Sequence, residues 1–169
     1  VEFFQAARDV RLEHAKLAAF GSTCRPGRPP DEDRNLQALI EVGTGVVTIF
    51  GKSWKLHVTE VFRTTLDENL RMIEESVRFL RDQGKRVIYD AEHFFDAFRD
   101  DSAYALRCLR AAVNGGAENV TLCDTNGSSL PAQVAEATER VVAEIGGEVG
   151  IHTHDDAGCG VANALVAVE

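Results

Sequence analysis

The sequence has no apolar run long enough to cross a bilayer, and no basic segment followed by an apolar one that would resemble a leader. It has four cysteines, Cys24, Cys108, Cys123 and Cys159, and they form neither a CxxC pair nor a regular spacing. This scarcity favours neither a disulfide framework nor a zinc-sulfur site. We therefore expect a protein of a reducing compartment such as the cytoplasm, with no membrane partner.

Positive charge is also scarce. Lys and Arg total 18 against 27 Asp and Glu, which gives a formal net charge of −9 and a sequence pI of about 5.0. Because the basic residues are dispersed, nucleic acid is not an expected partner, whereas small anionic substrates remain possible. With 169 residues, 44% of them hydrophobic, the chain can bury one sizeable core, so residues 1–169 are expected to form a single domain.

Both ends of the sequence lack the usual signals for a chain terminus or a helix end. Residue 1 is Val and already belongs to a helical pattern, and Glu169 lies in a helical pattern without a Gly or Asn cap. We therefore expect a piece of a longer protein.

Apolar periodicity and Gly or Pro breaks divide the chain into alternating strands and helices. The expected strands are 17–23, 46–50, 86–92, 119–125 and 149–154, and the expected helices are 1–12, 31–43, 66–83, 102–114, 131–145 and 159–168. Residues 54–65 are expected to be a long connection, in which Trp54 and Phe62 more often pack under the loop than contact a ligand. Strands roughly thirty to forty residues apart, with one helix between each pair, predict repeated βα units and a parallel sheet.

Polar side chains gather at the C-terminal ends of the expected strands. They are Ser22, Thr23, Lys52, Ser53, Asp90, Glu92, Asp124, Thr125, His152 and His154. Groups on successive strands converge only if the sheet curls, which favours a (β/α)8 barrel over a flat doubly wound sheet. A complete barrel needs about 250 residues, so the prediction is an incomplete barrel of about five βα units that lacks the first and last strands.

The segment 149–156 carries the strongest chemical signal. His152 and His154 are separated by one residue, so in a strand both imidazoles leave the same face, where they could bind one divalent ion such as zinc, manganese or magnesium. The alternative is that both are hydrogen-bonded, inert residues at a strand end, and the spacing alone does not decide between the two.

Further candidates lie on the neighbouring strand ends. Asp90 and Glu92 share one face by strand parity, and either could ligate, orient or shuttle a proton. Thr125 could hydrogen-bond a substrate carboxylate. Asp124 is expected to be a turn or capping residue. The remaining histidines, His14, His57 and His93, are expected to face solvent.

Five segments together are similar to a known family. AFGST (19–23), VTIFGKSW (47–54), YDAEHFFD (89–96), LCDTNG (122–127) and HTHDDAGCGVANALVAVE (152–169) resemble the isopropylmalate, homocitrate and citramalate synthases of the DRE-TIM metallolyase superfamily, and the citramalate-forming branch most closely. The resemblance covers essentially the whole chain. Asp155 departs from the family's usual His-x-His-Asn-Asp pattern, without an expected loss of metal binding.

The resemblance implies an acyltransferase of amino-acid biosynthesis, on the isoleucine or leucine route. It would be a metal-dependent homodimer that condenses the co-substrate acetyl-CoA with an α-keto acid, most closely pyruvate. The keto acid would chelate the metal, the deprotonated acetyl methyl would attack its ketone, and thioester hydrolysis would release CoA. By position, His152 and His154 match the family's metal ligands, Glu92 its catalytic acidic residue and Thr125 its carboxylate contact. Asp90 is taken as a further substrate contact.

Parts of the family's site have no match in this chain, namely an Asp-Arg pair on the first barrel strand and an Asn ligand on the last. The fragment alone is therefore expected to be inactive and prone to associate through open sheet edges. Within the family, a 2-isopropylmalate or homocitrate synthase stays open as an alternative, and two functions outside it stay open as well. A carbon-carbon lyase of the hydroxymethylglutaryl-CoA type is disfavoured by the YDAEHFFD segment, and a non-catalytic α/β binding module would be favoured if no divalent metal bound.

Overall fold

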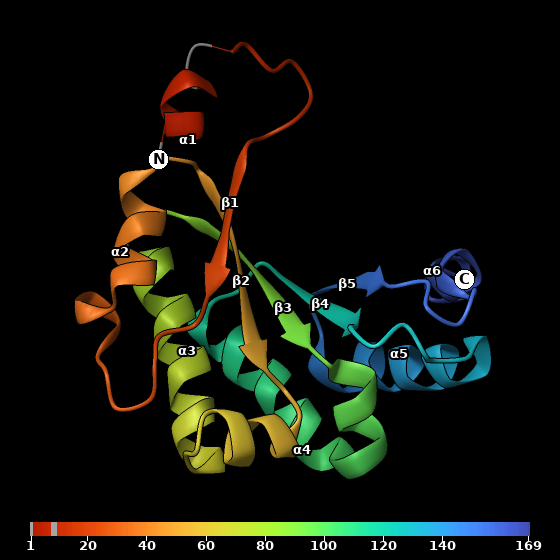
Figure 1. Ribbon diagram of the computed structural model, residues 1–169. Helices are drawn as coiled ribbons and strands as arrows, with labels where there is room; N and C mark the ends of the chain where they lie inside the picture. The colour runs from red at the N-terminus through yellow and green to blue at the C-terminus, as the bar shows by residue number, and fades with distance from the viewer. Residues whose placement is uncertain (1, 8–9) are drawn as a thin grey trace.

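The computed structural model describes residues 2–7 and 10–169 and shows alternating helices and strands (Figure 1). Along the chain the elements are α1 (Glu2–Ala7), β1 (Ala18–Ser22), η1 (Pro30–Glu32), α2 (Arg34–Glu41), β2 (Val46–Lys52), η2 (His57–Val61), α3 (Leu66–Asp82), β3 (Arg86–Glu92), α4 (Phe94–Gly115), β4 (Asn119–Asp124), α5 (Pro131–Ile145), β5 (Glu148–Thr153) and α6 (Gly160–Val166). Within the described ranges, no helix is both long and apolar enough to cross a membrane.

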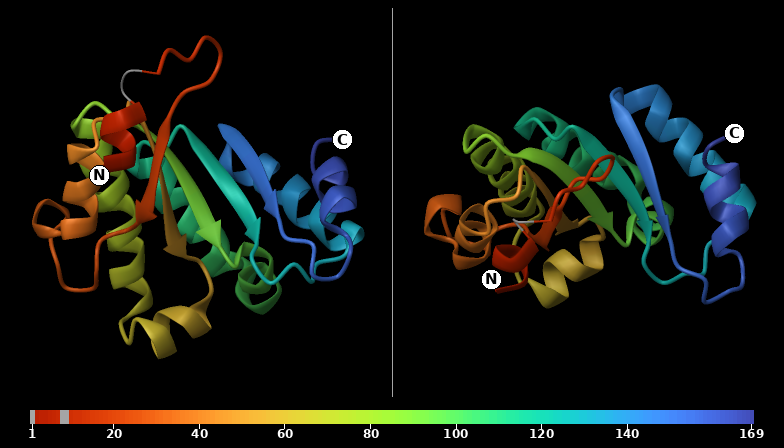
Figure 2. Two further views of the ribbon diagram at one scale, coloured as in Figure 1. Left: turned by 45° about the horizontal axis from the view of Figure 1, so that its top comes forward. Right: turned by 90° about the horizontal axis from the view of Figure 1, so that it is seen from above.

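The described residues form one sheet of five parallel strands in the order β1-β2-β3-β4-β5. In a doubly wound sheet the strand order reverses near the first strand, whereas in a barrel each strand lies beside the next one in sequence. Helices α2, α3, α4 and α5 cover one face of the sheet, and the strands twist progressively from β1 to β5 (Figures 1 and 2). This is the arrangement of part of a (β/α)8 barrel, which confirms the prediction.

Side-chain alternation separates the core from the opposite face of the sheet. In β3, Val87, Tyr89 and Ala91 are fully buried in the core cluster formed with the helices. The residues between them point to the other face, where the side chains are less covered: Phe20 of β1 is 63% exposed there. The helix-covered face therefore holds the core, and the opposite face, which carries both polar and aromatic side chains, is less covered.

Two predicted helices differ from the structure. The expected helix 1–12 is found only as Glu2–Ala7; Val1, Arg8 and Asp9 lie outside the described residues, and residues 10–17, which lead to β1, are not helical. The expected helix 102–114 begins earlier, at Phe94, because two helices meet end to end at Asp101, whose φ of −152° and ψ of 90° break the helical path. Asp101 then caps the second helix by accepting a hydrogen bond from the Tyr104 N–H at 3.0 Å.

The connection 54–65 is more ordered than expected. It contains a short helical segment that passes into a π-helix at His57–Val61, a rare form that often occurs near functional sites. Trp54 and Phe62 are partly buried against the core, which confirms the packing interpretation for both.

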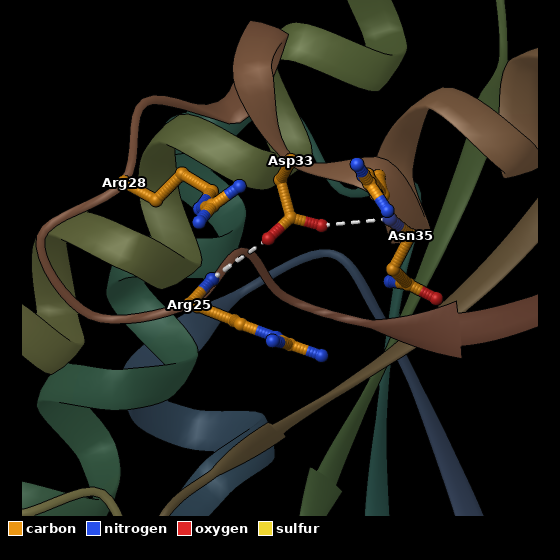
Figure 3. Close-up of a pocket in the computed structure, with 5 residues that line it drawn as sticks. Arg25, Arg28, Asp33 and Asn35 are labelled. Atoms are coloured by element: carbon orange, nitrogen blue, oxygen red, sulfur yellow. Dashed lines mark hydrogen bonds between the residues drawn. The ribbon is translucent and has the colours of Figure 1, made fainter.

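The loop between β1 and α2 is organised by one carboxylate. Asp33, 2% exposed, accepts hydrogen bonds from the backbone N–H groups of Arg25, Asn35 and Leu36, so it caps α2 and also holds the Pro-rich loop to it (Figure 3). A hollow of about 300 Å³ beside it is lined by Arg25, Arg28, Asp33, Arg34 and Asn35 and contains none of the predicted site residues.

Replacing this carboxylate should therefore cost more than an ordinary helix cap. Asp33→Ala leaves three N–H donors without their partner, and we expect the free energy of unfolding to fall by about 2 kcal/mol or more. The matched control is Asp31→Ala, because Asp31 is exposed and its side chain does not cap the helix. Urea unfolding of both variants measures the difference, and equal losses would contradict the role given to Asp33.

Candidate metal and substrate site

A cavity of about 180 Å³ lies at the C-terminal edge of the sheet. Each strand from β1 to β5 contributes to its wall, either directly or through the residue just beyond the strand. The lining residues are Phe20, Phe50, Asp90, Glu92, Cys123, Thr125, His152 and His154. The five residues predicted as site residues, Asp90, Glu92, Thr125, His152 and His154, thus line one cavity.

Strand register explains why these side chains meet. In the parallel pairing, Asp90 lies beside Thr121, and Cys123 lies beside His152. Because alternate residues share a face, the side chains at 90 and 92, 123 and 125, and 152 and 154 all project toward the same side of the sheet. Thr153, between the two histidines, instead donates a hydrogen bond to the Gly160 carbonyl at 2.9 Å.

The two imidazoles are held differently. Their ring centroids are 5.1 Å apart. The Nδ1 of His154 lies 2.9 Å from the Thr125 carbonyl oxygen, which can only accept, so Nδ1 carries the hydrogen and Nε2 keeps its lone pair for a cation. The Nδ1 of His152 lies 3.9 Å from Asp90 Oδ2, with His152 half exposed and Asp90 largely covered.

The donor set at this edge suits a divalent cation. Asp90, Cys123 and His152 each offer one ligand atom, and these three atoms lie within 4.8 Å of one another. Burial raises the pKa of the Asp90 carboxyl, and the neighbouring His152 ring opposes that rise. A bound cation would satisfy the buried carboxylate, so the chemistry of these donors is compatible with a divalent metal in this cavity.

Glu92 and Thr125 lie at the rim of the cavity and are fixed by neighbours. The Glu92 carboxylate forms an ion pair with Lys52 of the adjacent strand. The Thr125 hydroxyl oxygen accepts a 2.8 Å hydrogen bond from the His93 N–H, which leaves the hydroxyl hydrogen free to be donated. His93 reaches this position with a left-handed backbone, at φ 55°.

The first two strands contribute residues that were not predicted. Thr23 and Ser53 are buried and, with Ser22, do not line the cavity, so the expectation that they converge with the other polar groups is wrong. Phe20 and Phe50 take that place, with ring centroids 5.7 Å apart in a stacked arrangement.

The alternation of side chains along a strand could have predicted that both phenylalanines share a face with polar strand-end residues. Phe20 lies two residues before Ser22, and Phe50 lies two residues before Lys52. The same alternation links Cys123 to Thr125.

Asp124 is structural, as predicted. Its two carboxylate oxygens accept hydrogen bonds from the N–H and the hydroxyl of Ser129, at 3.1 and 2.9 Å, which shape the loop before α5.

The other histidines fall into two groups. His14 is exposed, as expected. The prediction that His57 and His93 face solvent is wrong, because their rings pack 4.5 Å apart beside Trp54, and burial lowers the pKa of His57. His93 is also held by Asp96, 3.1 Å from its Nδ1. His57 begins the π-helical segment, which brings its ring against His93 at the start of α4, a contact between distant residues that the sequence alone does not indicate.

Comparison with known proteins identifies a family that the chain matches. The model of the HMGL-like family matches residues 13–169. The (R)-citramalate synthase of Aquifex aeolicus is 51% identical over 167 residues, which is 98% of this chain and 32% of that protein. The homocitrate synthase of Saccharolobus solfataricus is 32% identical over 137 residues, covering 80% of this chain and 29% of that protein. The chain therefore spans about a third of the length of these curated relatives.

The HMG-CoA lyase of Bacillus subtilis shares the fold. Its crystal structure superposes with a TM-score of 0.79 at 19% sequence identity, over 99% of this chain and 55% of that one. At that identity the likeness concerns the fold alone.

The loops after β4 and β5 meet at Gly127. Its φ is 59°, the Ala157 N–H donates to its carbonyl at 2.8 Å, and an added Cβ would lie 2.8 Å from the Asp156 nitrogen and 3.0 Å from His154 Cβ. A side chain at residue 127 would therefore push on the segment that carries His154.

Gly127→Ala should destabilise the protein through both backbone strain and this collision, by about 2 kcal/mol or more. Gly84→Ala is the matched control, because Gly84 has a φ of 77° and nothing within 4 Å of an added Cβ, so it reports strain alone. We expect it to cost about 1 kcal/mol. Urea unfolding compares the two, and equal losses would show that the loop contact contributes nothing.

Proposed function

Since the chain belongs to the HMGL-like family, we propose that it forms the metal- and keto-acid-binding part of the catalytic barrel of a citramalate-type synthase, which condenses acetyl-CoA with pyruvate. The observation that carries this proposal is the joint presence of Glu92, Thr125, His152 and His154 around one cavity. Five relatives named (R)-citramalate synthase, 42 to 51% identical over nearly the whole chain, support the choice of reaction.

His152 and His154 are the residues proposed to hold the divalent cation, whether manganese, magnesium or zinc. His154 has Nε2 available because Nδ1 is bound to the Thr125 carbonyl. When bound, the cation supplies Lewis acidity toward a carbonyl group. Asp90 faces the same cavity beside His152, and we assign its carboxylate a contact with the substrate.

Thr125 is proposed to bind the carboxylate of the keto acid. Its oxygen already accepts from the His93 N–H, so its hydrogen points away to a second acceptor. A carboxylate oxygen in the cavity is such an acceptor, and a hydrogen bond to an ionised group is stronger than a neutral one.

Glu92 is proposed to take part in proton transfer. The ion pair with Lys52 fixes its carboxylate at the cavity rim, with 23% of the side chain exposed, so it can exchange a proton with a group bound in the cavity. Lys52 is a positioning residue in this arrangement.

The two phenylalanines that line the cavity support pyruvate as the keto acid. Phe20 and Phe50 stack on the side of the cavity formed by β1 and β2, and the cavity holds only about 180 Å³. The side chain of the keto acid would lie against these rings, so we expect its size to affect binding. One or two carbons of misfit are worth about 1–3 kcal/mol, or 10- to 200-fold in kcat/KM.

CoA release by the longest natural chain that contains these residues tests the function. With acetyl-CoA saturating, we expect kcat/KM to be highest for pyruvate, lower for 2-ketobutyrate, and much lower for ketoisovalerate and 2-ketoglutarate. Phe50→Ala should narrow the gap between pyruvate and ketoisovalerate by roughly 10-fold or more. Phe3→Ala serves as the control, because Phe3 does not line the cavity.

Other orders of preference would change the assignment. Preference for ketoisovalerate would favour an isopropylmalate synthase, and preference for 2-ketoglutarate a homocitrate synthase. Cleavage of hydroxymethylglutaryl-CoA without any condensation would favour the lyase, and a chain that binds no divalent metal and turns over none of these substrates would be a binding module.

Glu92→Gln separates proton transfer from scaffolding. The amide keeps the size and the hydrogen bonding of the side chain but removes its charge, so kcat should fall by about 100-fold or more with little change in KM. Glu118→Gln is the matched control, since Glu118 is also ion-paired to a basic residue, Arg86, but does not line the cavity. Lower stability with normal turnover per folded molecule would make Glu92 structural.

A further inference from the structure

We propose that Asp90, Cys123 and His152 form a binding site for zinc or another thiophilic divalent ion, with a ligand set distinct from the His152 and His154 pair. The three residues lie on β3, β4 and β5 and line the cavity. No step of the proposed condensation uses the sulfur, so the site is an addition to that function and does not depend on it.

The geometry of the three ligand atoms carries the proposal. The Asp90 oxygen, the Cys123 sulfur and a His152 nitrogen lie within 4.8 Å of one another, and Asp90 Oδ2 is 3.9 Å from His152 Nδ1. Tetrahedral zinc, with bonds of about 2.0–2.3 Å, places its ligand atoms about 3.3–3.8 Å apart. Side-chain movements of about 1 Å are therefore enough to close the ligands around the ion.

The register of the sheet preorganises this set. Cys123 is the direct neighbour of His152 in the β4–β5 pairing, and the Asp90 side chain projects from β3 to the same face. The sulfur makes only a long contact, 3.7 Å, to the Thr121 carbonyl, and the Cys123 residue is 6% exposed. A metal–sulfur bond would replace this long contact, and the thiol would release its proton as the metal binds.

Sulfur decides which metals the site prefers. Magnesium and manganese favour oxygen ligands, whereas thiolate selects zinc and other soft ions. Of the described residues that line the cavity, Cys123 alone carries sulfur.

His154 stays outside the set, held to the Thr125 carbonyl, while His152 would belong to both sites. A thiophilic ion would thereby withdraw His152 from the proposed catalytic cation; this inhibitory effect, unlike the site itself, rests on the proposed function.

Cobalt titration of the longest natural chain containing these residues tests the site, because a cobalt-sulfur bond gives a charge-transfer absorption band. We expect the band in the unaltered protein, its loss in Cys123→Ser, and its retention in Cys159→Ser. Cys159 is the control because it is the most exposed of the four cysteines and does not line the cavity. Zinc should displace the cobalt, and Asp90→Asn should weaken zinc binding by more than about 100-fold, beyond the loss typical of groups that do not touch the metal.

His154→Ala distinguishes the two ligand sets. The band should survive in this variant, and its disappearance would overturn the proposal, as would absence of the band in the unaltered protein or its loss in Cys159→Ser. Should Cys123→Ser fail to fold, zinc X-ray absorption on the unaltered protein decides: a sulfur neighbour at about 2.3 Å supports the site, and a shell of nitrogen and oxygen alone overturns it. Neither readout requires turnover, so failure of the condensation assay leaves this test intact.

Discussion

The parallel register of β3, β4 and β5 is the constraint on which the site depends. It places residue 123 beside residue 152 and residue 90 beside residue 121, and alternation then sends the polar member of each strand to the uncovered face. A shift of one residue in any strand would turn these side chains into the core. The buried residues of the opposite face, such as Val87 and Leu122, fix that register, because they fit only between the sheet and the helices.

Loops beyond the strand ends determine the final orientation of the side chains that the strand register brings together. The loop after β4 hydrogen-bonds to the loop after β5 through the carbonyls of Thr125 and Gly127, so the position of His154 depends on both loops. The His93 N–H ties the start of α4 to Thr125 in the same way. His152 is therefore positioned by its strand, whereas the orientation of His154, just beyond β5, is set by short loop contacts.

The cavity brings together groups that prefer different kinds of cation. A partly buried ion pair, a buried carboxyl with a raised pKa, two imidazoles and a thiol lie around one small space, with two aromatic rings on the side of β1 and β2. Hard and soft ligands side by side allow the same space to hold different cations. The proposed catalytic role and the proposed thiophilic site thus follow from one arrangement, in which His152 is the shared member.

The sequence by itself determined the repeated βα pattern, the parallel sheet, the pairing of faces in His152 with His154 and in Asp90 with Glu92, and the similarity to a synthase family. All of these depend on local periodicity or on short motifs. Only the tertiary structure decided that Lys52 pairs with Glu92 and that His57 and His93 are covered. It also decided that Phe20, Phe50 and Cys123, which strand parity assigns only to a face of the sheet, line one cavity. These facts depend on lateral register and on loops packing against each other, and such contacts join residues far apart in the chain, which no local pattern encodes.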